Sequence, residues 1–154
     1  MKSPKDESPA ASRTSVDGSF LQGFVGYNAR RATLTIMEVF NRRMAALNLK
    51  PAEFSILSLI GRNPGVTPSQ LCAELNLLPP KLAKVLARLD KRKLVGRKTL
   101  AADKRAVCLS LSSEGRKLLV EAESTVIELE AQVTAALTAK QRETLISLLK
   151  KIYS

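Results

Sequence analysis

Apolar residues recur every three or four positions from residue 19 to about residue 48, which is the spacing of one helix face. The stripe consists of Leu21, Phe24, Val25, Ala32, Ile36, Val39, Phe40, Met44 and Leu47. It predicts a long first helix. A second helix begins at Pro51, a residue that suits a first helical turn. It ends at Gly61, Pro64 and Gly65.

Two short helices joined by a tight turn come next. Thr67 caps the first of them, Pro68 takes its first position and Gln70 completes a capping box. This helix ends near Leu75, and the next begins at Pro79. Its apolar face consists of Leu82, Val85, Leu86 and Leu89. Its other face carries Lys81, Lys84, Arg88, Lys91 and Arg92. Such a pair, with the second helix basic, has the form of a helix-turn-helix.

A hairpin directly follows the basic helix. Apolar and polar residues alternate over residues 107–111, which predicts a half-buried strand. Residues 95–100 predict its partner, and residues 101–106 predict the tip. The tip carries three consecutive charged residues: Asp103, Lys104 and Arg105. A two-stranded hairpin in this position is a wing, the name kept below for residues 95–111.

Two more helices complete the chain. The first runs from Ser112 to about Leu137, and Thr138 with Gln141 forms a capping box for the last. The last helix has an apolar stripe of Leu145, Leu148, Leu149 and Ile152. The first helix and these two carry more apolar surface than the small central unit can cover, which indicates a partner surface. Because most oligomers are two-fold dimers, the expected partner is a second copy.

The net charge of +11 is concentrated in one segment of the 154-residue chain. Residues 78–106 hold ten basic and two acidic side chains, and this local excess is typical of a face that binds a polyanion. The length fits one domain or one protomer. We find no apolar run long enough to span a bilayer and no apolar signal segment in the polar N-terminus, so a cytoplasmic protein is expected.

The residue types restrict the chemistry. The chain has no histidine, no phosphate-binding glycine loop and only two cysteines, so we expect neither an enzyme nor a metal or cofactor site. Cys72 falls on the inward face of its helix and is expected to pack in the core. Cys108 falls on the polar face of its strand, where it could be reactive.

Two stretches carry a resemblance to a known family. They are NLKPAEFSILSLIGRNPGVTPSQLCAELNL and LARLDKRKLVGRKTLAADKRAVCLSLSSEG. Over residues 20–150 the chain resembles the MarR family (multiple antibiotic resistance regulators). The family's motif positions correspond to Leu89, Asp90, Lys91, Arg92, Lys93, Leu94, Val95, Arg97, Asp103, Lys104, Arg105, Leu111, Ser112 and Gly115. Two departures stand out: Lys93 replaces the usual glycine, and LLPP replaces the usual hydroxyl-rich start of the recognition helix.

The resemblance implies a mainly α fold with a small β-hairpin wing, in which long dimerisation helices flank a winged helix-turn-helix. Residues 1–18 are then a disordered tail, and residues 19–154 are a single protomer. Within it, residues 19–48 and 112–154 form the dimerisation helices and residues 49–111 the DNA-binding lobe. The implied function is a homodimeric repressor of transcription. It binds a pseudo-palindromic operator and is released by a small ligand.

The LLPP start of the recognition helix is similar to the same segment in relatives that respond to aromatic acids or their coenzyme A thioesters. The alternative function is a ligand-independent architectural protein that binds DNA without regard to sequence, because the basic segment alone would support such binding.

The resemblance also implies site residues. Expected DNA contacts are Ser69, Gln70, Pro79, Pro80, Lys81, Lys84, Arg88, Arg97, Asp103, Lys104 and Arg105. Of these, Arg105 is expected to enter a narrow minor groove, with Asp103 bracing it and Lys104 on a phosphate. Expected ligand contacts are Phe24, Tyr27, Asn28, Arg30, Arg31 and Phe54.

Overall fold

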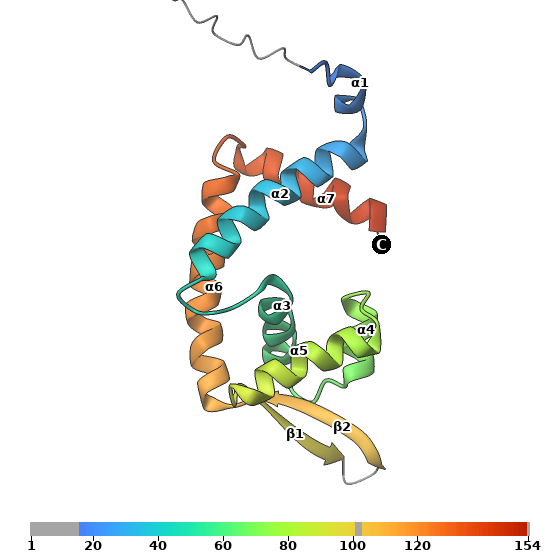
Figure 1. Cartoon of the computed structure of the whole chain (residues 1–154), viewed down its shortest axis with the longest axis vertical. Helices are drawn as coiled ribbons and strands as arrows, with labels where there is room; N and C mark the ends of the chain where they lie inside the picture. Colours follow the sequence, from blue (N-terminus) through green and yellow to red (C-terminus); the bar gives the residue numbers. More distant parts are fainter. Residues whose placement is uncertain (1–15, 101–102, 154) are drawn as a thin grey trace, which may run out of the picture. The chain divides into compact units, whose positions relative to one another are not determined.

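The structure is a computed structural model that describes residues 16–100 and 103–153, with the backbone alone described at 99–100 and 103–106. It contains two compact units, one ending at Thr33 and one beginning at Leu34. The elements in chain order are α1 (Ser19–Gln22), α2 (Val25–Met44), α3 (Pro51–Arg62), α4 (Pro68–Glu74), α5 (Pro79–Lys91), β1 (Val95–Leu100), β2 (Asp103–Leu111), α6 (Ser113–Val133) and α7 (Ala139–Tyr153) (Figure 1). The predicted class, helices with one small hairpin, is confirmed.

The prediction of one continuous helix over residues 19–48 is wrong. The helix is interrupted at Gly23, where the side-chain Nδ2 of Asn28 donates to the backbone carbonyls of Gln22 and Phe24 at 2.8 Å each. Glycine is a poor helix former, and a side chain that bonds local carbonyls competes with the helical pattern. The helix also ends at Met44, a few residues before Asn48, whose backbone is left-handed with φ 48°.

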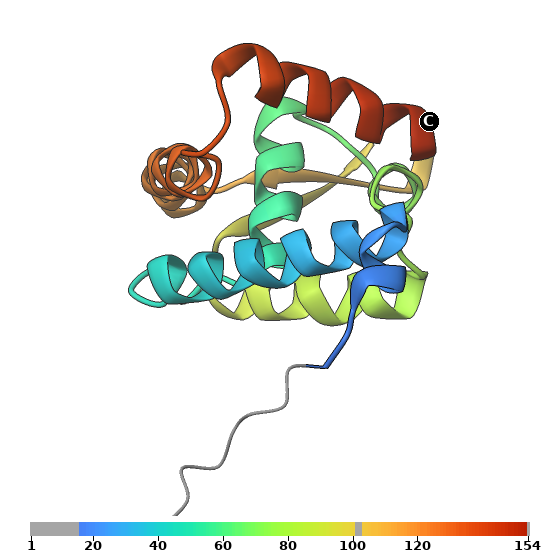
Figure 2. The same ribbon diagram turned by 90° about the horizontal axis from the view of Figure 1, so that it is seen from above.

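Helix α3 lies at the centre of the second unit. Figures 1 and 2 both show α6 on one side of it and α4 on the other. Its buried positions fit the predicted pattern, since Ile56, Leu57 and Ile60 are at most 1% exposed. Side chains from α2, α4, α5, the wing and α6 complete this core, among them Met44, Leu71, Leu82, Leu89, Leu109 and Leu129. The core therefore holds the helix-turn-helix and the wing together as one lobe.

The wing is an antiparallel pair of strands with an irregular end. The register runs from Val95 opposite Leu111 to Thr99 opposite Val107, and then shifts so that Leu100 lies opposite Asp103. The predicted tip of 101–106 is therefore too long, because β2 already begins at Asp103 and the additional residues 104–106 are accommodated by the shift.

Cys108 is buried at 9% exposure, so its predicted place on a polar face is wrong. The chain before α4 pairs with the outer edge of β2: Gly65 N donates to Leu109 O (3.0 Å), and Leu109 N donates to Val66 O (2.9 Å). Strand alternation alone does not reveal this pairing of a third short segment with β2. Cys72, expected in the core, is half-buried and packs against it.

The C-terminal helices differ in burial. Helix α6 ends at Val133 instead of about Leu137, and a turn follows in which Leu137 N donates to Thr134 O (2.9 Å). The capping box of α7 is confirmed: Thr138 N donates to Gln141 Oε1 (2.8 Å), and Gln141 N donates to Thr138 Oγ1 (3.2 Å). Helix α7 buries none of its residues and exposes Leu145, Ile146, Leu148, Leu149, Ile152 and Tyr153. Among the described residues, none of the helices is long and apolar enough to cross a membrane.

Candidate nucleic-acid interface

The first helix of the predicted helix-turn-helix begins as expected. Gln70 N donates to Thr67 Oγ1 (3.3 Å), and Thr67 N donates to Gln70 Oε1 (2.9 Å), so the capping box of α4 is confirmed. Ser69 and Gln70 are exposed in the first turn of this helix. Asn76 makes the turn toward α5 in a left-handed conformation with φ 48°.

The start of α5 has an unusual set of backbone donors. Pro79 and Pro80 have no N–H, and the N–H groups of Lys81 and Leu82 both donate to the carbonyl of Leu78 (2.9 and 3.1 Å). A helix N-terminus ordinarily binds phosphate through its unpaired N–H groups. In the first turn of α5 those groups are missing or occupied, so contacts with an anion there must come from side chains.

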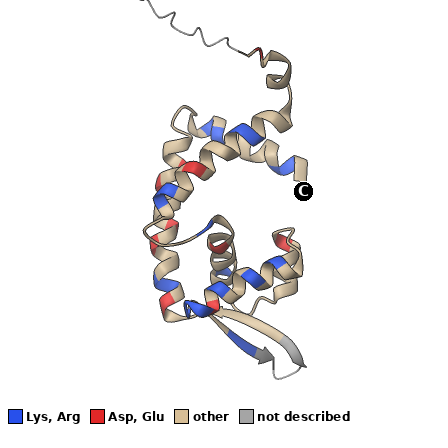
Figure 3. Cartoon of the chain, viewed as in Figure 1, with Lys and Arg blue, Asp and Glu red and all other residues tan. Residues whose placement is uncertain are grey.

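Helix α5 separates its apolar and basic residues as predicted. Leu82, Val85, Leu86 and Leu89 are buried, at most 4% exposed. The basic residues Lys81, Lys84, Arg88 and Lys91 are exposed, and Figure 3 shows Lys and Arg gathered on α5 and on the neighbouring strand β1. The lobe therefore presents a positively charged surface along one helix.

The Arg88 side chain is held by a buried carboxylate of α3. Its Nε donates to Oε1 of Glu53 at 2.8 Å, and the Glu53 side chain is only 5% exposed. The sequence interpretation placed Arg88 on the basic face but did not identify Glu53. The available signal was a lone acid within the apolar pattern of α3, three residues after Lys50, whose backbone N–H it caps at 2.9 Å.

Arg97 contacts the end of the same helix. Its Nη2 donates to Oδ2 of Asp90 at 2.5 Å, which joins β1 to α5. Three of the predicted DNA contacts, Ser69, Pro79 and Arg97, line one hollow between α4, α5 and β1. The side chains of the other predicted wing contacts, Asp103, Lys104 and Arg105, lie outside the described residues.

The junction between α5 and the wing is strained at Lys93. This residue has φ 56° in the left-handed region, at the position where the sequence lacks the usual glycine. Lys93 N donates to Asp90 O (2.8 Å), and its carbonyl accepts a bond from the hydroxyl of Ser112 (2.7 Å). The turn is thus fixed on both sides, which sets the direction of the wing relative to α5.

The residues expected to bind a ligand fall in both units. In the first unit, the rings of Phe24 and Phe20 pack edge to face with centroids 5.0 Å apart, and Arg31 Nη1 donates to the Tyr27 hydroxyl (3.2 Å). The guanidinium of Arg31 lies 5.9 Å from the centre of the Tyr27 ring.

Two further candidates have roles within the fold, and one is open to solvent. Asn28 bonds the backbone at the helix break described above, and Arg30 is exposed. In the second unit, Phe54 packs against Phe40 with ring centroids 6.0 Å apart.

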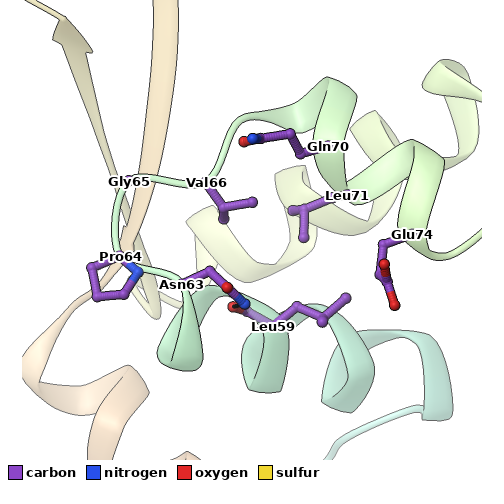
Figure 4. A pocket seen from close by; sticks show the side chains of 8 residues that line it. All are labelled: Leu59, Asn63, Pro64, Gly65, Val66, Gln70, Leu71 and Glu74. Carbon is purple, nitrogen blue, oxygen red and sulfur yellow. Dashed lines mark hydrogen bonds between the residues drawn. The ribbon is translucent and has the colours of Figure 1, made fainter.

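A second hollow, of about 570 Å³, lies between α3 and α4 (Figure 4). Its lining residues are Leu59, Asn63, Pro64, Gly65, Val66, Gln70, Leu71 and Glu74. Its polar side chains are exposed, and Asn63 and Gln70 bond the Leu59 carbonyl and Thr67 respectively. The hollow was not expected from the sequence, and two of its polar residues have roles in the fold, since Asn63 ends α3 and Gln70 caps the start of α4.

Known proteins are similar to this chain over most of its length. Residues 47–106 match a family model described as "MarR family". The chain is 30% identical over 139 residues to a protein of Thauera aromatica named as a transcriptional regulatory protein for the hcr operon, covering 90% of this chain and 83% of that one.

Among solved structures, the transcriptional repressor CouR bound to a 23-mer DNA duplex aligns with a TM-score of 0.87 and 31% identity, covering 92% of this chain and 100% of that one. CouR bound to p-coumaroyl-CoA aligns with a TM-score of 0.80 and 31% identity, covering 90% and 97%.

Proposed function

This chain belongs to the MarR family of transcriptional regulators, and from that premise we propose that it is a homodimeric, sequence-specific DNA-binding repressor released by an acyl-coenzyme A or aromatic-acid ligand. The observation that carries the proposal is the exposed basic face of α5 on a helix-turn-helix that the core holds rigid. CouR, which shares this fold at 31% identity, is a repressor that binds a DNA duplex. The family's proteins are regulators, not enzymes, and we propose a cytoplasmic regulator without catalytic activity.

In the proposed complex, α5 enters the major groove at Pro79 and Pro80. Lys81 and Lys84 reach base edges or phosphates, since the backbone of the first turn has no donor to offer. Ser69 and Gln70, exposed in α4, donate to phosphates.

The wing would reach the neighbouring minor groove. Arg105 would insert there with Asp103 as its brace and Lys104 on a phosphate, and Arg97 would hold the wing against α5 through Asp90. A second copy of the chain would place a second α5 about one DNA turn away, so the operator should be pseudo-palindromic.

A competition assay tests sequence-specific binding. The labelled probe is duplex DNA from the promoter region of the chain's own gene, and the competitors are the same duplex unlabelled and a random duplex of equal length. At fixed salt, a specific regulator should prefer its site by roughly 10³-fold or more. Equal competition by both duplexes would establish the architectural alternative instead.

The ligand class is proposed from the relative and from the residues of the first unit. CouR binds p-coumaroyl-CoA, a thioester with an aromatic acyl group and a phosphorylated carrier. Phe24 and Tyr27 offer aromatic surface, and Arg30 and Arg31 offer positive charge. Such a ligand lowers DNA affinity only if it binds the DNA-free conformation more tightly.

Binding and release are measured together. We expect p-coumaroyl-CoA to raise the melting temperature of the chain and to dissociate the promoter duplex, whereas free coenzyme A should do neither. Arg30→Ala should weaken binding of the ligand without weakening binding of DNA. A thioester that stabilises the chain but leaves the DNA complex intact would contradict release by this ligand.

A further inference from the structure

Arg88 of α5 and Arg92, the residue that directly follows α5, hold the segment that joins α2 to α3. Arg88 bonds Glu53 in the first turn of α3, and Arg92, four residues later at the C-cap of α5, bonds the backbone just before α3. Both arginines point the same way because residues four apart share a helix face. The C-terminal half of α5 is thus attached at two points to residues 47–53.

The first point of attachment is a nearly buried carboxylate. Oε1 of Glu53 accepts from Nε of Arg88 (2.8 Å), and Oε2 accepts from the backbone N–H of Lys50 (2.9 Å). Glu53 as a whole is 4% exposed, the single charged residue in the described part of the chain that is so deeply buried. A buried charge is stable only when it is paired, so moving Arg88 away toward DNA would leave Glu53 uncompensated.

The second point of attachment is the backbone at the end of α2. Nη1 of Arg92 donates to the carbonyl of Asn48 (2.7 Å), and Nη2 donates to that of Leu47 (3.0 Å). Asn48 is left-handed, so the chain turns sharply there and presents both carbonyls to one guanidinium. The planar fork of arginine suits such paired acceptors, and lysine could not reproduce it.

The geometry points to Arg88 and Arg92 as positioning residues for DNA binding, which set the angle of α5 on the lobe and do not themselves read DNA. This inference rests on the proposed function. It assigns Arg88 a different role from Lys81 and Lys84, although all three share the basic face. The N-terminal half of α5 has no side-chain cap, so its direction depends on apolar packing and on this clamp. We call this group, Glu53, Arg88 and Arg92 with the carbonyls of Leu47 and Asn48, the clamp.

The clamp predicts that Glu53, which lies beneath α5, controls DNA affinity. We compare Glu53→Gln, Arg88→Met and the double variant on the promoter duplex and on random DNA, over a series of salt concentrations. Each single change should weaken promoter binding on the order of tenfold, and the double variant should be no weaker than either, because one interaction is lost in all three. Random-duplex affinity and the salt slope should stay as in the unaltered chain. Arg92→Met should likewise weaken promoter binding and leave the random-duplex affinity and the salt slope unchanged.

Lys84→Met is the matched control, since Lys84 lies one turn before Arg88 on the same exposed face. It should reduce the slope of log K against log salt by about 0.9, as expected for one lost phosphate contact. The clamp is refuted if Glu53→Gln leaves promoter affinity unchanged, or if Arg88→Met reduces the slope as Lys84→Met does.

Thermal unfolding of each variant separates a misplaced helix from a lost fold. If Arg88→Met does not fold, the double variant removes the stranded carboxylate, and Arg92→Met tests the clamp independently. If the unaltered chain does not distinguish the promoter from random DNA, the proposed function fails, whatever the variants do.

Discussion

Lys93 is the residue where local conformation and residue type disagree most. Its φ of 56° lies in a region that costs a side chain roughly 1 kcal/mol and costs glycine almost nothing. We expect Lys93→Gly to raise the free energy of unfolding by about 1 kcal/mol, less whatever the more flexible unfolded chain offsets. Denaturant unfolding measures it, with Lys93→Ala as the control that removes the side chain but keeps the strain. Equal stability of the two variants would show that the backbone relaxes there.

Gly115 is fixed by a close approach of two backbones. A Cβ at this position would lie 2.1 Å from the carbonyl oxygen of Leu94, and backbone cannot turn aside as a side-chain end can. Gly115→Ala should therefore cost roughly 2–4 kcal/mol of unfolding free energy, measured by chemical denaturation. Gly26→Ala is the control, since nothing lies within 4 Å of that position. A Gly115→Ala variant as stable as the control would mean that α6 can shift away from Leu94.

The conformation of some residues could be predicted from the sequence, whereas the contacts of others could not. The departure at Lys93 was visible in the family pattern, and its left-handed backbone follows from where the helix ends. The partner of Arg88 was not foreseeable in the same way, because the bond to Glu53 joins residues 35 positions apart and depends on how α3 and α5 pack. Periodicity shows which face a residue occupies, but it does not show what lies beneath that face.

At the scale of elements, the wing is the part whose proposed role is most open to direct measurement. Arg105→Ala should weaken promoter binding by on the order of 1–3 kcal/mol, beyond the loss of one ion contact, because a minor-groove arginine also reads groove width. Lys98→Ala, in the facing strand β1, should cost less and act equally on random DNA. Binding titrations and a footprint check both. An unchanged affinity and footprint for Arg105→Ala would leave the charged triplet as the start of β2 without a DNA contact.

Most element boundaries followed from capping residues and apolar spacing. The helices that begin at Pro68, Pro79 and Ala139 were predicted, since proline or a capping box marks each start. The errors occurred where competition among weak signals decides the outcome. Gly23 with Asn28 interrupts the first helix, and Cys108 is buried although its strand alternation places it on a polar face.

At the scale of the whole molecule, the exposed apolar face of α7 predicts the dimer. Leu148 is 54% exposed although it lies in an apolar stripe, and we expect it to become buried against a second copy. Leu148→Asp should shift the mass measured in dilute solution from dimer to monomer and weaken promoter binding, since two half-sites must be held together.

Lys150→Asp is the control for the added negative charge, because Lys150 lies outside that stripe. It should leave the dimer intact. A folded monomer of the unaltered chain at micromolar concentration would contradict the dimer and, with it, the expectation of a pseudo-palindromic operator.

Helix α7 has a consequence for how much regulator a cell can keep. Because its apolar side chains stay exposed in the described chain, this helix would gain stability from the expected dimer, and mass action would then make the melting temperature rise with protein concentration. Freshly made or diluted chains would expose a sticky helix that chaperones and proteases recognise, whereas paired chains would not. The supply of active regulator would then respond more than proportionally to synthesis, so that small changes in expression switch the target genes sharply.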